Sequence, residues 1–291
     1  MSKRNLLLVG IAAMTSILVN INAYGQTAVT SVFASGLRAP VKTIFTPKGN
    51  LLVAEAGNGP NTGRISIIDS GGNRRTLIDG LPSGFAPPNN DASGPSALAL
   101  RGRNLYIVIG GGDATLAGPV PATEIPNPNP SSQFLSSVLT FRLSPQVEDT
   151  TQGFTFTSDD QIALLNHGFS KLVDAAGNQV TLEVLINFHN FTFEPRPNFA
   201  GNVRTSNPFG IAANGKKLYV VDASQNQVWE VDSNTGESRV VFRFNPKANP
   251  LFPFGPPFID VVPDGVRLIG KSLLLCAASD WLPVSSGRSR N

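Results

Sequence analysis

The sequence predicts an all-β protein of the NHL-like β-propeller class, built from four-stranded antiparallel blades. The 291-residue chain has 28 Gly and 23 Pro but only 15% charged residues, which suits short strands and turns better than long amphipathic helices. An apolar strand that follows a turn also recurs, with the leading leucines Leu51, Leu105, Leu218 and Leu273. Repeated sheets of this kind bury their faces by stacking on one another, as propeller blades do.

The first 25 residues have the pattern of a secretory signal peptide. Lys3 and Arg4 precede an uninterrupted apolar run over residues 6–19, and small residues follow. We expect cleavage after Ala23 or Gly25, with an uncleaved anchor as the alternative. The mature protein is then secreted or periplasmic and has no membrane span.

The charge balance does not favour nucleic acid as a partner. The formal net charge is +3, and Lys3 and Arg4 supply two of these positive charges within the expected signal peptide. The chain has no cluster of Lys and Arg, which a nucleic-acid binder would need. Cys276 is the only cysteine, so we expect a core thiol and no internal disulfide.

The full repeat unit contains four strands, which we name a, b, c and d in chain order. Strand a begins near a proline in every unit, at Pro40, Pro95, Pro208 and Pro263. The predicted domain covers residues 26–291, with blades at about 40–81, 95–188, 208–244 and a partial blade at 263–283. Residues 29–37 resemble the end of a strand d, and we expect them to be a closing strand that pairs with the last blade.

The second unit carries two insertions. A Pro- and Asn-rich stretch delays its strand c until Val138. Beyond that strand we expect a short helix whose N-cap is Ser158 or Asp159, and then a hairpin that ends in strand d. The fourth unit shows no strand c after Ala277, so we expect either an imperfectly closed ring or a truncated propeller of about four blades.

The ordered motifs GNLLVAEAG, GPSALAL, SNPFGIAA, LYVVDASQNQVWEVD and VPDGVRLIG resemble the ScyD/ScyE family of exported, NHL-like propeller proteins. The resemblance extends from about Val29 to Pro283. It implies a six-bladed propeller, and it carries over no catalytic residues. This chain departs from the family pattern by ending short of the last two blades.

The loops predict where a binding site would lie. Strand direction alternates within a blade, so the a–b and c–d loops share one face and the b–c and d–a loops share the other. The a–b loops are tight, and we call their face the tight face. The long-loop face carries the long connections at residues 56–63, 81–95, 110–136, 188–208 and 245–257. Long loops on a rigid scaffold commonly carry binding sites, although they can also be tolerated insertions.

Polar residues near this face are the candidates for a site. Glu55 and Asp222 both end a strand b, where an acid can either fasten a loop by accepting backbone hydrogen bonds or contact a ligand or metal. Phe188, Phe191, Phe193 and Phe199 can fasten their loop or form an apolar recognition surface. The predicted ligand-binding residues are Glu55, Asn58, Asn61, Asp113, Asp222 and Asn226.

The sequence carries no motif for catalysis or for metal binding. His167 and His189 are not at metal-binding spacing, and no nucleophile elbow occurs. We therefore expect a non-catalytic exported propeller that needs no cofactor and binds an extracytoplasmic protein, glycan or small organic ligand. The alternative is a gluconolactonase- or strictosidine-synthase-like hydrolase with a divalent cation in the central channel, where Asn214 and Asp264 are the available polar residues.

Overall fold

The computed structural model describes residues 31–254, 257–277 and 280–285. The chain divides into two units, residues 1–32 and residues 33–291. The predicted signal peptide lies outside the described residues, and the fold below is that of the second unit. Among the described residues, no helix is long and apolar enough to cross a membrane.

The first blade is a four-stranded antiparallel meander, as predicted. Its strands are β1 (Pro40–Phe45), β2 (Leu51–Glu55), β3 (Gly63–Ile68) and β4 (Arg74–Leu81). The c–d turn between β3 and β4 is held by the Asp69 carboxylate, which accepts hydrogen bonds from the backbone N–H groups of Gly71 and Asn73 at 2.8 and 3.0 Å. Short polar side chains hold turns in this way, so the local sequence sets the strand pairing.

The second and third blades repeat this order. Blade 2 consists of β7 (Pro95–Arg101), β8 (Asn104–Ile109), β11 (Ser137–Arg142) and β14 (Gln179–Asn187), with β13 (Phe169–Val173) added as an outer fifth strand. Blade 3 consists of β17 (Pro208–Asn214), β18 (Lys217–Asp222), β19 (Gln227–Asp232) and β20 (Ser238–Arg243). The hairpin β13–β14 confirms the predicted end of the second unit.

The fourth blade corrects one prediction. Its strands are β23 (Pro263–Ile269), β24 (Ser272–Ala277) and β25 (Asp280–Ser285). A strand c is therefore present, and β25 pairs antiparallel with β24 from Ala277↔Asp280 to Ser272↔Ser285. The sequence pattern did not reveal it because Pro283 lies inside the strand. Proline is tolerated at the edge of a sheet, where a missing backbone N–H breaks no ladder bond.

The proline that begins strand a has the same role in each blade. Pro40, Pro95, Pro208 and Pro263 lie opposite Glu55, Ile109, Asp222 and Ala277, and the register of the a–b pair shifts directly after each proline. A β-bulge suits a residue that cannot donate to the ladder. The alignment of the four units in the sequence is thus repeated in the register of the four sheets.

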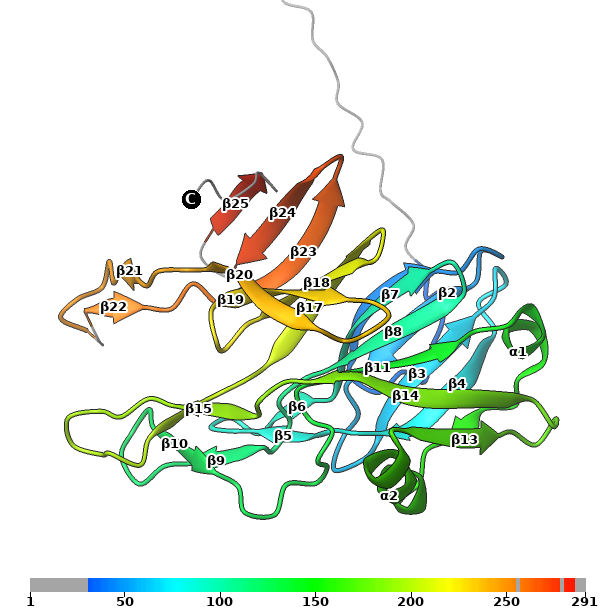
Figure 1. Cartoon of the computed structure of the whole chain (residues 1–291), viewed down its shortest axis with the longest axis horizontal. Coiled ribbons are helices and arrows are strands. Elements are labelled where there is room, and N and C mark those ends of the chain that lie inside the picture. Colours follow the sequence, from blue (N-terminus) through cyan, green and yellow to red (C-terminus); the bar gives the residue numbers. More distant parts are fainter. Residues whose placement is uncertain (1–30, 255–256, 278–279, 286–291) are drawn as a thin grey trace, which may run out of the picture. The chain divides into compact units, whose positions relative to one another are not determined.

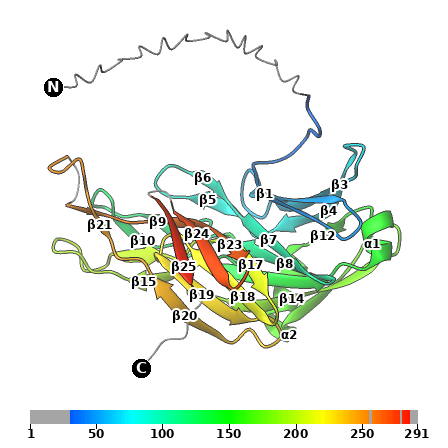
Figure 2. The same ribbon diagram turned by 90° about the horizontal axis from the view of Figure 1, so that it is seen from above.

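The inner strands pack side by side in the order β1, β7, β17 and β23. Figure 1 shows the blades following one another from the blue and cyan strands to the red ones, and Figure 2 gives the view from above. The fold class is therefore all-β, with propeller blades arranged as successive sheets around their inner strands.

The predicted closing strand at residues 29–37 is not a strand over its described part, residues 31–37. Residues 33–36 pack against blade 1. The Arg64 guanidinium donates to the Gly36 carbonyl at 2.7 Å. A Cβ placed on Gly72 would lie 2.2 Å from the Phe33 carbonyl oxygen, so the segment also runs close to the c–d turn.

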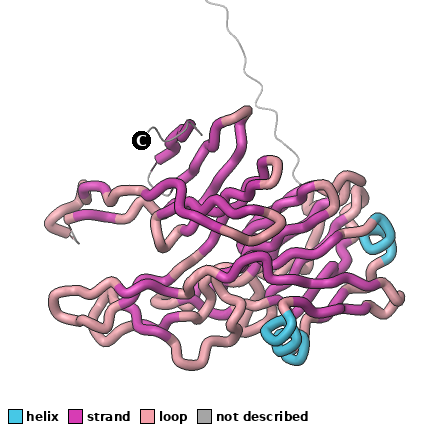
Figure 3. Tube along the Cα trace, in the orientation of Figure 1, coloured by secondary structure: helices cyan, strands magenta, loops and turns pink. Residues whose placement is uncertain are grey.

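The insertion in blade 2 contains α1 (Pro145–Thr150), β12 (Phe154–Thr155) and α2 (Ser158–His167). Strand β12 pairs in parallel with β4, so an insertion of the second blade covers the outer edge of the first. Figure 3 shows that both helices lie beside the strands of these two blades. The predicted helix exists, but its N-cap is Thr157 instead of Ser158 or Asp159, because Thr157 and Asp160 form a reciprocal capping box.

The insertion near residues 144–179 is a c–d connection, which predicts a place on the tight face, but it does not stay there. It begins there, since the Glu148 side chain of α1 accepts hydrogen bonds from Thr46 and Asn50 in the first a–b loop. Strand β12 then runs alongside β4, and the Gln161 side chain of α2 donates to Asn61 on the long-loop face at 3.1 Å. The insertion therefore connects both faces along the outer edge of blade 1.

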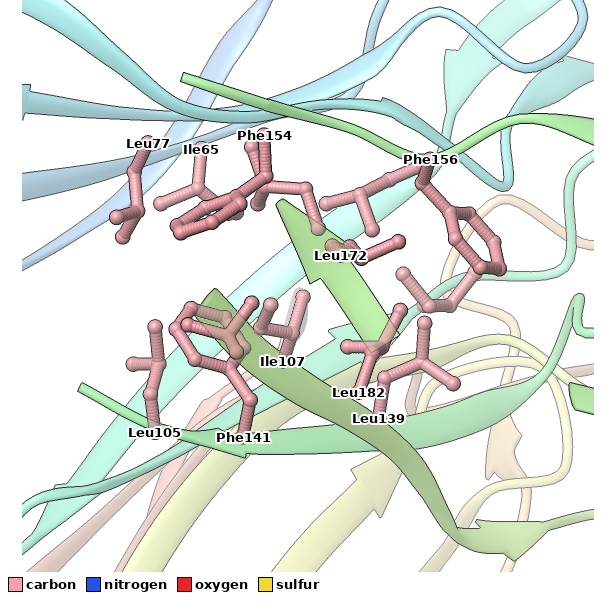
Figure 4. Close-up of a cluster of buried hydrophobic side chains, with 14 of the residues drawn as sticks. Ile65, Leu77, Leu105, Ile107, Leu139, Phe141, Phe154, Phe156, Leu172 and Leu182 are labelled. Atoms are coloured by element: carbon pink, nitrogen blue, oxygen red, sulfur yellow. The ribbon is translucent and has the colours of Figure 1, made fainter. Parts of the chain in front are cut away.

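The largest core cluster lies between blades 1 and 2. Figure 4 shows Ile65 and Leu77 of blade 1 facing Leu105 and Ile107 of blade 2. Phe154 of the insertion fills the same space and is fully buried. Similar clusters join blade 2 to blade 3 and blade 3 to blade 4, so each interface between blades has its own apolar core.

The long loops are ordered by small sheets of their own. Loops that are distant in sequence form a sheet in the order β15 (Phe191–Phe193), β16 (Val203–Thr205), β10 (Glu124–Pro126) and β9 (Thr115–Ala117). The other two d–a loops contain the hairpins β5 (Gly84–Ala86) with β6 (Asp91–Ser93), and β21 (Lys247–Ala248) with β22 (Phe258–Ile259). We call the four-stranded sheet the loop sheet.

Replacing Phe154 with Ala should lower the free energy of unfolding by about 3–5 kcal/mol, because it leaves a cavity between blades 1 and 2. Urea denaturation measures the loss. Phe45→Ala is the matched control, since Phe45 on β1 is 71% exposed, and it should change stability by less than about 1 kcal/mol. Equal losses in the two variants would show that β12 adds nothing to the core.

Candidate functional site

A cleft of about 300 Å³ lies on the long-loop face, where the first residues of several inner strands meet the long loops. Val41 of β1, Ser96 of β7 and Phe209 of β17 contribute from the blades. The loops contribute the hairpin β5–β6, residues 111 and 112, and both halves of the loop sheet. The predicted face thus contains a concave site, built where three blades and their loops converge.

Close approach of backbones shapes this cleft. A Cβ on Gly111 would lie 2.7 Å from the Ser206 carbonyl oxygen, so only glycine allows the b–c loop of blade 2 to pass the d–a loop here. The Gly111 backbone N–H donates to Asn207 Oδ1 at 3.0 Å. The two loops are therefore fastened to each other by residues that line the cleft.

A chain of hydroxyl groups orients the Glu124 carboxylate. Thr115 Oγ1 donates to Glu124 Oε2 at 2.7 Å and lies 2.8 Å from Thr205 Oγ1. A hydroxyl has a single proton to donate, so Thr205 must be the donor to Thr115. The order Thr205 to Thr115 to Glu124 presents the carboxylate as an acceptor, held by two neighbouring strands of the loop sheet.

Several polar groups of the cleft keep hydrogen-bonding capacity after their internal bonds are counted. Ser93 Oγ accepts from the Gly112 N–H at 2.9 Å, which leaves its own proton to donate. Asn207 uses its side-chain oxygen internally, and within the described part of the chain its Nδ2 group has no acceptor. Ser224 and Asp91 likewise line the cleft without a side-chain bond to another described residue. Donors and acceptors are therefore interspersed around one small space.

A second cleft of about 200 Å³ adjoins the first and shares Glu124, Thr205 and Ser224 with it. Its charges are largely paired. Arg204 contacts Glu194 Oε1 at 2.6 Å and Asp260 Oδ2 at 2.9 Å, and it also donates to the Ser224 carbonyl. Arg204 therefore links the loop sheet to the d–a loop that enters blade 4.

Glu55 is buried and fastens the start of blade 1. Its carboxylate accepts from the Arg38 backbone N–H at 2.5 Å, from the Arg64 guanidinium at 2.5 and 3.1 Å, and from the Ser66 hydroxyl at 2.5 Å. Glu55 is 0% exposed. This is the fastening role considered from the sequence, with the donors coming from the entry to strand a and from strand c.

Asp222 has the equivalent position in blade 3 and is also fully buried. It accepts hydrogen bonds from the Ser206 hydroxyl at 2.6 Å and from the backbone N–H groups of Asn207 and Gln225 at 2.9 and 3.1 Å. Burial raises the pKa of this carboxyl above its usual value, although these three hydrogen bonds oppose the shift. Asp222 thus holds both the end of the d–a loop that leads into blade 3 and the b–c turn of that blade.

The remaining predicted residues lie in the loops around the clefts. Asn61 donates to the Ser131 carbonyl and accepts from Gln161, and Asp113 accepts from Ser131. Asn226 donates to Asp260 at 2.6 Å and accepts from the Val262 N–H. Asn58 is exposed, and its backbone N–H donates to Thr62.

None of the six predicted residues lines either cleft. Five of them hold loops, and their contact with a ligand stays a prediction. Sequence reasoning missed Asp91, Glu124, Asn207 and Ser224, which do line the first cleft. The GGG segment at residues 110–112 was the one available signal, since close backbone approach often accompanies glycine runs.

Of the aromatic run, Phe188 is 6% exposed and packs in the core between blades 2 and 3, whereas Phe193 is 75% exposed. The two alternatives for this run therefore apply to different residues. Phe188 fastens the loop to the core, and Phe193 lies on the outer strand β15 of the loop sheet with its ring in solvent.

The inner strands form a separate cavity of about 320 Å³, lined by Lys42, Asp264 and Cys276 among others. Burial and the neighbouring Asp264 raise the pKa of the Cys276 thiol above its usual value, which disfavours the reactive thiolate. Asn214, the other polar candidate for a channel metal, is exposed at the end of β17. In the described part of the chain, no group of three or more His, Cys, Asp or Glu residues could hold a metal ion.

The geometry defines the molecule as a propeller-type protein with a polar cleft on one loop face. No known family model matches the chain, and no curated protein is similar in sequence.

Several solved structures are similar over most of the chain. A computationally designed protein, Ika4, matches at 10% identity and TM-score 0.36, covering 89% of this chain and all of that one. A putative oxidoreductase (glucose dehydrogenase) of Thermus thermophilus matches at 17% identity and TM-score 0.33, covering 89% and 83%. The PQQ-bound aldose sugar dehydrogenase of Streptomyces coelicolor matches at 15% identity and TM-score 0.32, covering 88% and 84%.

Glu55→Gln should lower the free energy of unfolding by about 3 kcal/mol or more, because it leaves a buried arginine without its charge partner. Asp222→Asn is the matched variant. It should cost less than about 1 kcal/mol, since Asn retains the Oδ1 acceptor and the Ser206 hydroxyl can rotate to accept. Chemical denaturation compares the two. Similar costs would contradict the different roles assigned to these acids.

The raised pKa of Asp222 predicts a pH dependence of stability. The folded state holds the proton more tightly than the unfolded chain, so this contribution is full below the usual Asp value of 3.8 and is lost as pH rises through the raised pKa. The free energy of unfolding of wild type, measured relative to Asp222→Asn, should therefore fall as the pH rises from about 4 towards 7. A relative stability that grows over this interval would exclude a raised pKa.

Proposed function

We propose that the protein is an extracytoplasmic, non-catalytic binding propeller whose long-loop face holds a small, hydroxyl-rich organic ligand such as a sugar. On the repeat motifs alone, we also propose that the chain is related to the ScyD/ScyE family. Fold alone does not decide function, so the proposal depends on the cleft.

The observation that carries the proposal is the first cleft with its uncommitted polar groups. At about 300 Å³ it is at the lower end of the range for sites that hold small molecules. Ser93 and Asn207 can donate to a ligand, while Asp91 and Glu124 can accept from it. Vicinal hydroxyl groups are both donors and acceptors, so a polyhydroxylated ligand would satisfy both kinds of group.

The rigidity of the surroundings also supports binding. The loops around the cleft are held in place by side-chain hydrogen bonds of Asn61, Asp113, Asp222 and Asn226. A site whose frame is already ordered loses less conformational entropy when the ligand binds. Phe209 adds an apolar ring surface against which the carbon face of a sugar can pack.

Ser224→Phe should abolish this binding, because Ser224 lines both clefts and a bulky ring there would fill the shared space. Affinities for a panel of sugars and polyols, measured by ligand-detected NMR, should fall by at least about tenfold. Ser70→Phe, in an exposed turn of blade 1, is the matched control and should bind as wild type does.

Two results would overturn the proposal. One is a panel in which ligands bind equally well to wild type and to folded Ser224→Phe. The other is stoichiometric divalent metal in the purified protein together with lactone hydrolysis, which would instead support the hydrolase alternative.

A further inference from the structure

The charged residues of the first cleft all have the same sign. Asp91 and Glu124 are the two charged side chains among the described residues that line it. Neither has an Arg or Lys within ion-pair distance in the described part of the chain. The ammonium of Lys42 lies 5.6 Å from the centre of the Phe209 ring, and Lys42 lines the separate cavity of the inner strands.

The adjoining cleft shows the contrast. Its acids Glu194 and Asp260 share Arg204 as a counter-ion at 2.6 and 2.9 Å. Glu124 lines both clefts, yet among the described residues its one side-chain partner is the Thr115 hydroxyl. An acid left without a counter-ion, beside others that have one, provides the charge that a ligand can complement.

The hydroxyl chain makes Glu124 well suited to receive a cation. Because Thr115 donates to Oε2, the carboxylate is held in position before any ligand binds. Thr115 is only 1% exposed, so this hydrogen bond is shielded from water. A preorganised acceptor forms a charge-assisted hydrogen bond without the loss of its own rotational freedom.

We propose that the ligand carries a protonated amine beside its hydroxyl groups, as an amino sugar does, and that Glu124 is the counter-ion of that amine. This inference rests on the proposed function, since it names the ligand class of the same cleft. Ser93, Asn207 and Ser224 then serve the hydroxyl groups, and Asp91 lies at the exposed rim of the cleft.

The test compares glucosamine, glucose and N-acetylglucosamine as probes, by ligand-detected NMR and calorimetry. Glucosamine carries the positive charge, glucose lacks the nitrogen, and N-acetylglucosamine keeps the nitrogen without the charge. Glucosamine should bind at least about tenfold more tightly than the other two. Added salt should reduce this advantage, because the interaction is electrostatic and partly exposed.

Glu124→Gln keeps the size of the side chain and removes its charge. It should bring the affinity for glucosamine to that for glucose, and leave the affinity for glucose within about twofold. Glu237→Gln is the matched control, since Glu237 is exposed in the c–d turn of blade 3, on the tight face. Melting temperatures of both variants would confirm that they fold.

The outcomes separate this inference from the proposed function. Equal binding of glucose and glucosamine to wild type overturns the counter-ion role and leaves the sugar site standing. Failure of all three probes to bind, with no effect of Ser224→Phe on any ligand, overturns the site itself. Binding that requires added calcium ion and is lost in Glu124→Gln would also overturn the inference, because a metal would then be the cation.

Discussion

Burial of both faces of each blade is the constraint on which the rest of this protein depends. A single four-stranded sheet with apolar side chains on both faces cannot be stable alone, and each blade covers the face of the next. The cluster between blades 1 and 2 shows this dependence, because Phe154 of the insertion and Leu172 of the outer strand β13 complete its core. Stacking in turn places the inner strands side by side and brings their loops to common faces.

The end of strand b shows how the same geometry accommodates polar residues. The equivalent positions Glu55, Ile109, Asp222 and Ala277 all lie opposite the proline of strand a and are all buried. An apolar residue at this position packs in the core, whereas a buried acid needs hydrogen-bond donors from neighbouring residues. Glu55 accepts hydrogen bonds from an arginine, and Asp222 accepts them from backbone N–H groups and a serine. Of the two roles that the sequence allowed for these acids, the structure shows the one that holds the loops.

The cleft is formed by the long loops, which these buried acids and their hydrogen bonds hold in place. Glu124 and Thr205 are distant in sequence, and they meet because β10 pairs with β16 in the loop sheet. The face was predictable, since alternating strand direction sorts loops whatever their sequence. The lining residues were not, since Glu124 stands in a Pro-rich stretch with no local pattern to distinguish it. Glu124 stands out because no cation pairs with it among the described residues, and such a feature depends on neighbours in three dimensions.

The sequence by itself determined that the protein is built of four-stranded propeller blades and that each strand a begins at a proline. It also determined which four positions are equivalent at the end of strand b, and which face carries the long loops. These features are local, because turn chemistry and strand periodicity act over a few residues. Only the tertiary structure decided that residues 33–38 pack on blade 1, that the insertion covers the edge of β4, and that β25 is the third strand of blade 4. It also decided which polar groups of the cleft are left without an internal hydrogen bond. Each of these depends on contacts between distant segments, and the energy of such contacts comes from burial and pairing that no local stretch of sequence contains.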